Sequence, residues 1–464
     1  MRMKRIFTLF LIVSLIFMST PIAWAAETAH EPITQELVLM VEHNPELKTL
    51  LIKSIEQAKA VNPDKNSNPV QSLDEFYDFV DWADHALPWS ILPNVESTYP
   101  GLYDQIDQSL DYFYFITDQP LEELEGMEFY NNSLQYYEPY RSWMIKFTKQ
   151  WGEYLSTSES WNEAYYQTAY NNQDFGLQNG WYEDPSNWHS FNDFFSRFLI
   201  STAARPIASP DDNSVVAAPA DSLPQGVWQI DGDSRVVGDG VRIKSLTFDS
   251  ISALLGEGTS YGDAFAGGIL THTFLNVQDY HRFHFPVSGT ILEVRTIYQD
   301  DAVGGITYWD KEANRYVLNA EDYGWQAVET RGCVIMKTED YGLVALMPVG
   351  MSQVSAVMFE DNIKPGIVVK KGDMLGYFLF GGSDYVMIFQ NIAGFEMTAP
   401  KNADSEGYTH LLMGESYGIL TGIPTVVADS KSNTVWDGTM AIILTIVLVG
   451  GVAFAVRKGK NDNR

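Results

Sequence analysis

A change in the spacing of apolar residues divides this chain into two unlike halves, and it limits the folds that the chain can adopt. Residues 26–185 are rich in Tyr, Trp and Phe and poor in Gly, with apolar residues at helical spacing. Residues 186–427 instead carry short β-branched and apolar runs separated by Gly. The expected fold class is therefore α+β, with a helical, aromatic-rich N-terminal domain followed by a mainly β domain that carries a few helices.

Three stripes of apolar residues in the first half follow a helical i, i+3, i+4 pattern. The first breaks near Asn44-Pro45, and the second ends before Leu87-Pro-Trp89. Their members are Leu37, Leu39, Met40, Leu47, Leu50, Leu51 and Ile55; Phe76, Phe79, Val80 and Trp82; and Tyr137, Tyr140, Trp143, Met144, Phe147, Trp151 and Tyr154. Such stripes are typical of helix-packing core rather than of a ligand platform. Residues 172–186 have little periodicity and predict a linker.

The second half predicts strands at residues 289–297, 342–347, 367–369 and 385–389, and a short helix near residues 250–255. Two of its turns, Pro286-Val-Ser-Gly289 and Val369-Lys-Lys-Gly-Asp-Met-Leu-Gly376, resemble the turns of small β sandwiches that carry lipoyl groups. The single cysteine, Cys333, excludes an intrachain disulfide and a cysteine-based metal cluster. Its apolar neighbours predict a buried strand residue.

Both ends of the chain predict contact with a membrane. Residues 1–25 have the basic, apolar and small-residue regions of a secretory signal peptide, or of an uncleaved anchor. Residues 439–456 are an uninterrupted apolar run without charges, about the minimum that spans a bilayer. The basic tail at residues 457–464 is expected to stay cytoplasmic, so the catalytic part lies on the other side, joined by a spacer at residues 428–438.

Charge and composition exclude several classes of partner. The chain has 60 acidic and 30 basic side chains, which argues against nucleic acid and against broad adhesion to anionic lipid. There is no His-Glu-x-x-His pattern and no complete calcium loop, so no metal is expected. The membrane attachment is therefore assigned to the C-terminal helix.

The turn Gly381-Gly-Ser-Asp384 carries the chemistry that most constrains function. A serine hydroxyl can attack the carbonyl carbon of its own preceding peptide bond when glycine supplies the strained backbone. Elimination from the resulting ester leaves dehydroalanine, which hydrolyses to a pyruvoyl group. Here the scissile pair is Gly382 and Ser383. The alternative is an ordinary turn between two strands.

A base for Ser383 is available in Tyr280-His-Arg-Phe-His284, because an activated nucleophile needs a base and the base needs an orienting group. The two histidines are three residues apart. On a strand they would point to opposite faces, whereas at a turn both can approach one site. Asp221 stands in Ala217-Ala-Pro-Ala-Asp-Ser222, where Asp after Pro-Ala commonly makes only a turn.

These segments form an ordered series that resembles the phosphatidylserine decarboxylase family of pyruvoyl enzymes over roughly residues 185–395. The series is Ser190-Phe-Asn-Asp-Phe-Phe-Ser-Arg197, Ala204-Arg-Pro-Ile207, Ala218-Pro-Ala-Asp221, Asp279-Tyr-His-Arg-Phe-His-Phe-Pro286, Met347-Pro-Val-Gly350 and the glycine-serine turn. The resemblance implies that residues 186–427 form the catalytic domain and that Ser383 is the precursor of the pyruvoyl cofactor.

By the same resemblance, His284 is the base toward Ser383, Asp221 fixes the tautomer of His284, and His281 is the acid that protonates the decarboxylated carbanion. Asp279 and Arg282 are interpreted as structural. The cut would leave a large chain that ends at Gly382 and a small chain that begins at residue 383, and the two stay together.

Two departures from the family pattern bear on function. The usual Leu-Gly-Ser-Thr is replaced by Gly381-Gly-Ser-Asp384, and the usual Pro-Ala-Asp-Gly ends in Ser222. The first departure resembles a divergent branch that includes decarboxylases of free aromatic amino acids.

Three functions follow as expectations. The leading one is a membrane-anchored decarboxylase that converts phosphatidylserine to phosphatidylethanolamine and CO2 on the non-cytoplasmic side. The second is a pyruvoyl decarboxylase of a free amino acid, with the aromatic amino acids as one possible class. The third is a catalytically dead relative that acts as a binding or scaffold module, for which the carboxylate of Asp384 beside the serine is the main support.

Overall fold

The computed structural model describes residues 30–127, 129–238, 242–243, 246–247, 249–298, 306–319, 324–350, 357–380, 382–403 and 407–423, without the side chains of residues 242, 243, 246, 247, 325, 328, 382 and 383. The predicted signal peptide, spacer, membrane span and basic tail lie outside these residues and stay predictions. Within the described ranges, no helix combines the length and the apolar character that crossing a bilayer requires.

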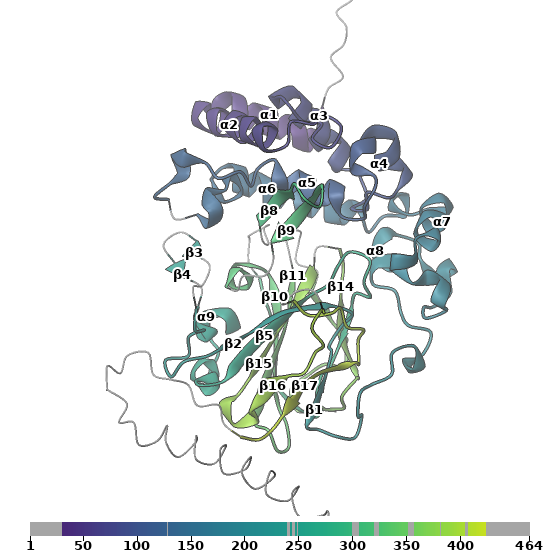
Figure 1. Ribbon diagram of the computed structural model, residues 1–464, viewed down its shortest axis with the longest axis vertical. Helices are drawn as coiled ribbons and strands as arrows, with labels where there is room; N and C mark the ends of the chain where they lie inside the picture. Colours follow the sequence, from purple (N-terminus) through teal and green to yellow (C-terminus); the bar gives the residue numbers. More distant parts are fainter. Residues whose placement is uncertain are drawn as a thin grey trace, which may run out of the picture.

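The first part of the chain is helical, as the apolar spacing predicts (Figure 1). All three predicted stripes form helices: the first becomes α1 and α2, the second α3 and the third α6. The break between α1 and α2 has a local cause, because the Asn44 side chain accepts a hydrogen bond from the Leu47 amide and Pro45 occupies the first helical position. The helices are α1 (Pro32–His43), α2 (Pro45–Val61), α3 (Leu73–Ala83), α4 (Pro93–Thr98), α5 (Gln108–Phe115), α6 (Tyr140–Tyr154), α7 (Glu163–Asn171) and α8 (Phe191–Phe195).

The segment predicted to be a linker is ordered by its aromatic residues. It consists mainly of 3₁₀ turns, and Phe175 and Tyr182 within it are buried in the same core as strand residues of the second part. Phe175 packs against Trp89, with ring centroids 4.4 Å apart. The helical and β parts therefore share one continuous core across residues 172–186.

The second part is mainly β, and the predicted strands and short helix are confirmed. The strands are β1 (Val215–Ala217), β2 (Leu223–Gln229), β3 (Arg242–Ile243), β4 (Leu246–Thr247), β5 (Ile269–Phe274), β6 (Arg282–His284), β7 (Gly289–Ile297), β8 (Ile306–Asp310), β9 (Arg315–Asn319), β10 (Arg331–Lys337), β11 (Leu343–Gly350), β12 (Val357–Phe359), β13 (Val368–Val369), β14 (Met374–Phe378), β15 (Gly382–Phe389), β16 (Phe395–Met397) and β17 (Ser416–Leu420), with helix α9 (Ile251–Leu255).

One antiparallel sheet forms the centre of the β part. It has seven strands in the order β13-β7-β10-β11-β15-β5-β2, and three-stranded sheets β12-β14-β6 and β1-β17-β16 accompany it. Successive residues of a strand face opposite sides, so the central strands bury two cores. Tyr385 and Met387 of β15 join the core that includes β6 and the helices α6 and α8, whereas Val386 and Ile388 join the core on the other face.

Cys333 is a buried residue of β10, as predicted. Burial raises the pKa of its thiol to about 11, so the thiolate form is disfavoured at neutral pH.

The hairpin β8–β9 leaves the β part and docks among the helices, next to α5 (Figure 1). Tyr316 of β9 is fully buried among helical residues. Its amide donates to Gln108 Oε1 at 2.7 Å, and Gln108 Nε2 donates back to the Tyr316 carbonyl at 2.9 Å. The helical part is thus held to the β part by hydrogen bonds between the Gln108 side chain and the Tyr316 backbone, as well as by the shared core.

Candidate active site

The predicted cleavage pair lies in a β-bulge. In the pairing of β15 with β11, Val349 faces Asp384 and the next residue, Gly350, faces Gly382, so residue 383 is left without a partner in the ladder. On the other side of β15, the ladder with β5 ends at the pair Asp384–Phe274. Bulges are over-represented next to active sites because they release a residue from regular pairing.

The sequence predicted a turn at Gly382-Ser383, and the structure corrects this. The scissile pair forms the first two residues of β15, so it lies in a strand rather than in a turn. The pairing of β15 with β11 reaches back beyond the apolar run as far as Gly382. The side chain of Ser383 is outside the described part, so its predicted contact with His284 stays a prediction.

The histidine motif lies beside the chain on both sides of the scissile pair. The strand β6 pairs with β14, and the Phe378 amide donates to the His281 carbonyl at 2.9 Å. After the pair, the ring of Tyr385 lies against the ring of Phe283, with centroids 5.8 Å apart. The pairing with β14 and the ring contact with Tyr385 therefore place β6 beside the chain before and after residues 382 and 383.

His284 is buried and its tautomer is defined by its surroundings. Its Nδ1 lies 2.9 Å from the Gly372 carbonyl, which can only accept, so Nδ1 carries the hydrogen and Nε2 is the basic nitrogen. The Tyr280 hydroxyl donates to this Nε2 at 3.2 Å. Burial lowers the pKa of His284 to about 4, so the ring is neutral at neutral pH.

Asp221 does not orient His284 in this structure. Its two carboxylate oxygens accept hydrogen bonds from Arg205 Nε at 2.9 Å and Arg205 Nη2 at 2.6 Å, and the Met413 amide donates to the same carboxylate at 2.7 Å. The planar guanidinium offers a bidentate partner that a ring nitrogen cannot match. The predicted tautomer-fixing role therefore belongs to Gly372, while the negative charge of Asp221 partly offsets the effect of burial on the pKa of His284.

His281 is fully buried and neutral. Its Nδ1 donates to the Asp279 carbonyl at 2.9 Å, and its ring stacks on Phe195 with centroids 3.6 Å apart. Burial and the charge of Arg197 lower the pKa of His281 well below its usual value. Its Nε2 has no partner among the described residues. The predicted acid role therefore requires that His281 first takes up a proton.

Asp279 and Arg282, which the sequence interprets as structural, each contact a distant part of the chain. Asp279 accepts from His410 Nε2 at 3.0 Å, and Arg282 donates to the Ser196 carbonyl and pairs with Glu360. The signal for Arg205 was present in Ala204-Arg-Pro-Ile207. No local pattern pointed to His410, because its partner Asp279 is distant in sequence.

The carboxylate of Asp384, beside the candidate serine, is fully engaged. His272 Nδ1 donates to one oxygen at 3.1 Å, and Gln326 Nε2 donates to the other at 3.2 Å. Asp384 and His272 are both fully buried. The sequence marked Asp384 as a departure from the family pattern but did not identify either partner.

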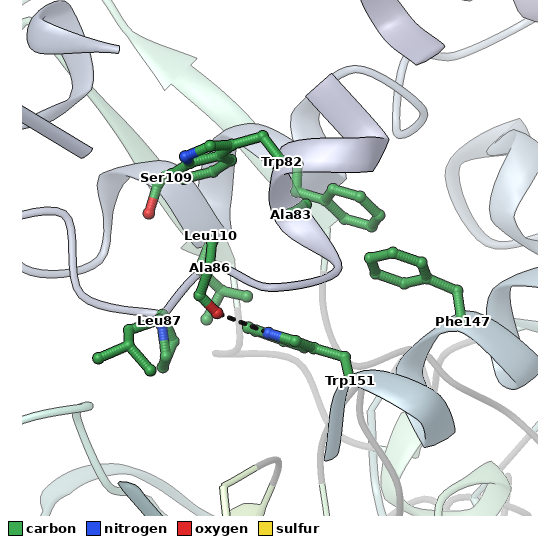
Figure 2. Close-up of a pocket in the computed structure, with 10 residues that line it drawn as sticks. Trp82, Ala83, Ala86, Leu87, Ser109, Leu110, Phe147 and Trp151 are labelled. Atoms are coloured by element: carbon green, nitrogen blue, oxygen red, sulfur yellow. Dashed lines mark hydrogen bonds between the residues drawn. The ribbon is translucent and has the colours of Figure 1, made fainter. Parts of the chain in front are cut away.

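A small apolar cavity in the helical part is not the reaction site. Figure 2 shows residues of α3, α5 and α6 around it, with Trp151 donating to the Ala86 carbonyl at 2.7 Å. The cavity holds about 20 Å³, roughly one water molecule, whereas ligand pockets enclose roughly 300–1,000 Å³. It is a packing gap between aromatic side chains.

Comparison with known proteins gives one consistent family. The sequence profile of the phosphatidylserine decarboxylase family matches residues 191–418. The phosphatidylserine decarboxylase proenzyme of Chlamydia felis is 32% identical over 240 residues, which cover 50% of this chain and 71% of that protein.

Two further relatives are matched over smaller shares of their length. Phosphatidylserine decarboxylase proenzyme 2 of Oryza sativa subsp. japonica is 33% identical over 244 residues, 52% of this chain but only 36% of that protein. Decarboxylase iboD of Amanita muscaria is 31% identical over 210 residues, 43% of this chain and 58% of that protein. The matched region contains the bulge, the histidine motif and the Arg205–Asp221 pair, and this chain therefore belongs to the phosphatidylserine decarboxylase family, a family of carboxy-lyases.

Proposed function

We propose that this protein is a self-cleaving, pyruvoyl-dependent decarboxylase that cuts itself between Gly382 and Ser383. The observation that carries the proposal is the bulge that releases residue 383 from pairing, two residues before Tyr385, whose ring contacts Phe283 of the strand that bears His284. The relatives named proenzymes support the same conclusion, because a proenzyme is a precursor that is processed.

The self-cleavage proceeds from this chain's own atoms. The Ser383 hydroxyl attacks the carbonyl carbon of Gly382, the Gly382–Ser383 peptide C–N bond breaks, and an ester with a free amine remains. Loss of the α-proton of residue 383 expels the Gly382 carboxylate and leaves dehydroalanine. Addition of water and release of ammonia then give the pyruvoyl group.

His284 is suited to begin this sequence. Its Nε2 carries no hydrogen, so it can accept the proton of the serine hydroxyl once its hydrogen bond with the Tyr280 hydroxyl is broken. The Arg205–Asp221 pair keeps a carboxylate near the ring without binding it directly. Neutral His284 is thus the form present over the physiological pH range.

The surroundings fit a small polar group at residue 383. Among the described residues, His281 Nε2 and the Tyr385 hydroxyl are buried polar atoms without a partner, and Tyr385 lies two residues after the scissile serine. When formed, a pyruvoyl group supplies the electron sink that decarboxylation requires. We assign to His281 the uptake of a proton at Nε2 and its delivery to the product.

Phosphatidylserine is the proposed substrate, converted to phosphatidylethanolamine and CO2 on the non-cytoplasmic side of the membrane. The names of the relatives support a lipid substrate, and the apolar run at residues 439–456 supports a membrane anchor on the small chain. A free amino acid is the second candidate. It is favoured by the relative named only a decarboxylase and by the Gly381-Gly-Ser-Asp384 turn.

The intact mass of the denatured protein tests the cleavage, with Ser383→Ala as the matched variant. Two chains divided between residues 382 and 383, with a blocked amino terminus on the small chain and no cut in the variant, are the expected result. A single uncut chain in the folded wild type would leave a binding or scaffold module as the better account.

The substrate and the anchor need separate assays. CO2 release is measured from vesicles that contain phosphatidylserine and, in parallel, from free tryptophan, tyrosine and phenylalanine. Turnover of the vesicles alone is expected, while turnover of a free amino acid alone would establish the second candidate. Resistance of the small chain to alkaline extraction from membranes tests the anchor, and release into the supernatant would contradict it.

A further inference from the structure

Asp384 is a carboxylate directly attached to the residue that must react. In self-cleavage, negative charge develops on the Gly382 carbonyl oxygen, and a nearby unneutralised carboxylate opposes it. A functional enzyme with aspartate at this position needs a structural means of keeping that charge away. Such a need exists only if the chain cleaves itself as proposed above.

The side chain of Asp384 lies on the face of the sheet away from the histidine motif. Along β15, Tyr385 and Met387 join the core that contains Phe283 of β6, whereas Val386 and Ile388 join the core of the opposite face. Strand alternation places Asp384 with the second set. The partner His272 of β5 lies on that same face, which it shares with Leu270 two residues earlier.

Two donors from distant parts of the chain hold the carboxylate there. His272 comes from the neighbouring strand, and Gln326 comes from the 3₁₀ turn Trp325–Val328. The ring of His272 is itself stacked against Trp228 of β2, with centroids 5.1 Å apart. Each carboxylate oxygen thus has its own donor, and the side chain has no free rotation.

We propose that His272 and Gln326 are positioning residues that hold the Asp384 carboxylate by hydrogen bonds on the far face of β15, so that the Gly382–Ser383 peptide can be cut despite its acidic neighbour. The family's usual threonine at this position carries no charge and requires no such arrangement. The His272–Asp384–Gln326 cluster is therefore the structural counterpart of the departure seen in the sequence.

The test measures the rate of self-cleavage of the full chain in a cell-free synthesis time course, resolved on denaturing gels. The variant is His272→Ala, which leaves the Asp384 carboxylate with one donor. The matched control is Leu270→Ala, a truncation of a buried residue on the same strand and face that does not touch Asp384. Thermal unfolding of the accumulated protein records the loss of stability in each.

His272→Ala is expected to slow cleavage by about tenfold or more, while Leu270→Ala cleaves at nearly the wild-type rate despite a comparable loss of stability. Adding Asp384→Asn to His272→Ala removes the charge and is expected to restore cleavage to within about threefold of wild type.

Three outcomes would overturn the proposal. Equal slowing in the His272 and Leu270 variants would make the effect one of stability alone. A double variant as slow as His272→Ala would show that the charge is not the cause. Wild-type cleavage in His272→Ala would show that the cluster is not needed, whereas an uncut wild type would remove the proposed function itself and this inference with it.

Discussion

Arg205 and Asp221 form a bidentate ion pair that is almost completely buried, with Nε–Oδ1 and Nη2–Oδ2 distances of 2.9 and 2.6 Å. The guanidinium also lies over the ring of Trp181, 4.2 Å from its centroid. The pair joins the segment after α8 to the segment before β2, and it places the Asp221 charge near His284 without direct contact.

Replacing Arg205 with methionine is expected to lower the free energy of unfolding by about 3–5 kcal/mol, because it leaves a buried carboxylate unpaired. Asp221→Asn is expected to lower the free energy of unfolding by less in the Arg205→Met background than in the wild type, because the two side chains interact directly. Denaturant unfolding measures both. The exposed pair Lys48–Glu42 is the control, where Lys48→Met should change stability by less than about 1 kcal/mol. An Arg205 effect as small as that of the control would contradict a structural role.

The rate of self-cleavage is expected to show no inflection near pH 6.5. Burial lowers the pKa of His284 to about 4, and the reactive form is the neutral ring, so the rate should be flat from about pH 8 to pH 5.5 and fall only below about pH 5. The rate of chain separation, corrected for the folded fraction, measures this. The correction matters because a group with a lowered folded pKa loses its contribution to stability as pH falls from the unfolded pKa toward the folded one. A rate that halves near pH 6.5 would show that His284 titrates as an exposed histidine.

Asp118 is expected to make the docking of the β8–β9 hairpin depend on pH. Burial raises the pKa of Asp118 to about 7, while its carboxylate accepts hydrogen bonds from the Thr307 amide at 2.9 Å and the Ser133 hydroxyl at 3.0 Å. A raised folded pKa gives a contribution that is fully present below about pH 4 and is lost as the pH rises through about 7. The loss amounts to at most about 4 kcal/mol.

Asp118→Asn is therefore expected to be more stable than wild type at pH 8, with a smaller difference at pH 5. The amide keeps an acceptor for the Thr307 amide, and it can donate to the Ser133 hydroxyl, which in turn donates to the Thr117 carbonyl. Thermal midpoints at the two pH values measure the difference. The control is Asp174→Asn, a replacement of an exposed aspartate. Equal thermal midpoints of wild type and Asp118→Asn at pH 8 would contradict the prediction.

Tyr316 is expected to be the main anchor of the hairpin. Its hydroxyl donates to the Ser67 carbonyl at 2.9 Å and accepts from Asn62, and its ring packs on Phe115. Tyr316→Ala should destabilise the protein by about 3–5 kcal/mol, and Tyr316→Phe by about 1 kcal/mol. Tyr308→Ala, a truncation of a half-exposed tyrosine in the same hairpin, is the control.

Hydrogen exchange of the helical part provides the readout for these hairpin variants. Faster exchange in residues 30–160 with Tyr316→Ala, and little change with Tyr308→Ala, would show that the hairpin holds the helices in place. Unchanged exchange in both variants would mean that the shared core near Trp89 and Phe175 is enough to hold the helices in place without the hairpin.

The secondary structure could be predicted where local chemistry decides it. The break at Asn44-Pro45 is an N-cap followed by proline, and the strand at residues 289–297 is a β-branched run that begins with glycine. Both signals act within a few residues, so they can be seen without the fold. The prediction of a turn at Gly382-Ser383 was wrong because the first residue of a strand depends on how far the neighbouring strands extend. Here those neighbours are β11 and β5, which are distant in sequence.

The amino-acid sequence by itself determined the family, the α+β class and the residues that can carry the chemistry, because these follow from short ordered motifs and from local apolar spacing. Only the tertiary structure decided the partners of those residues. It paired Asp221 with Arg205 rather than His284, oriented His284 by the Gly372 carbonyl, and joined Asp384 to His272. Ion pairs and hydrogen bonds between buried groups depend on which segments the core brings together. A local pattern of residues does not specify which distant segments those are.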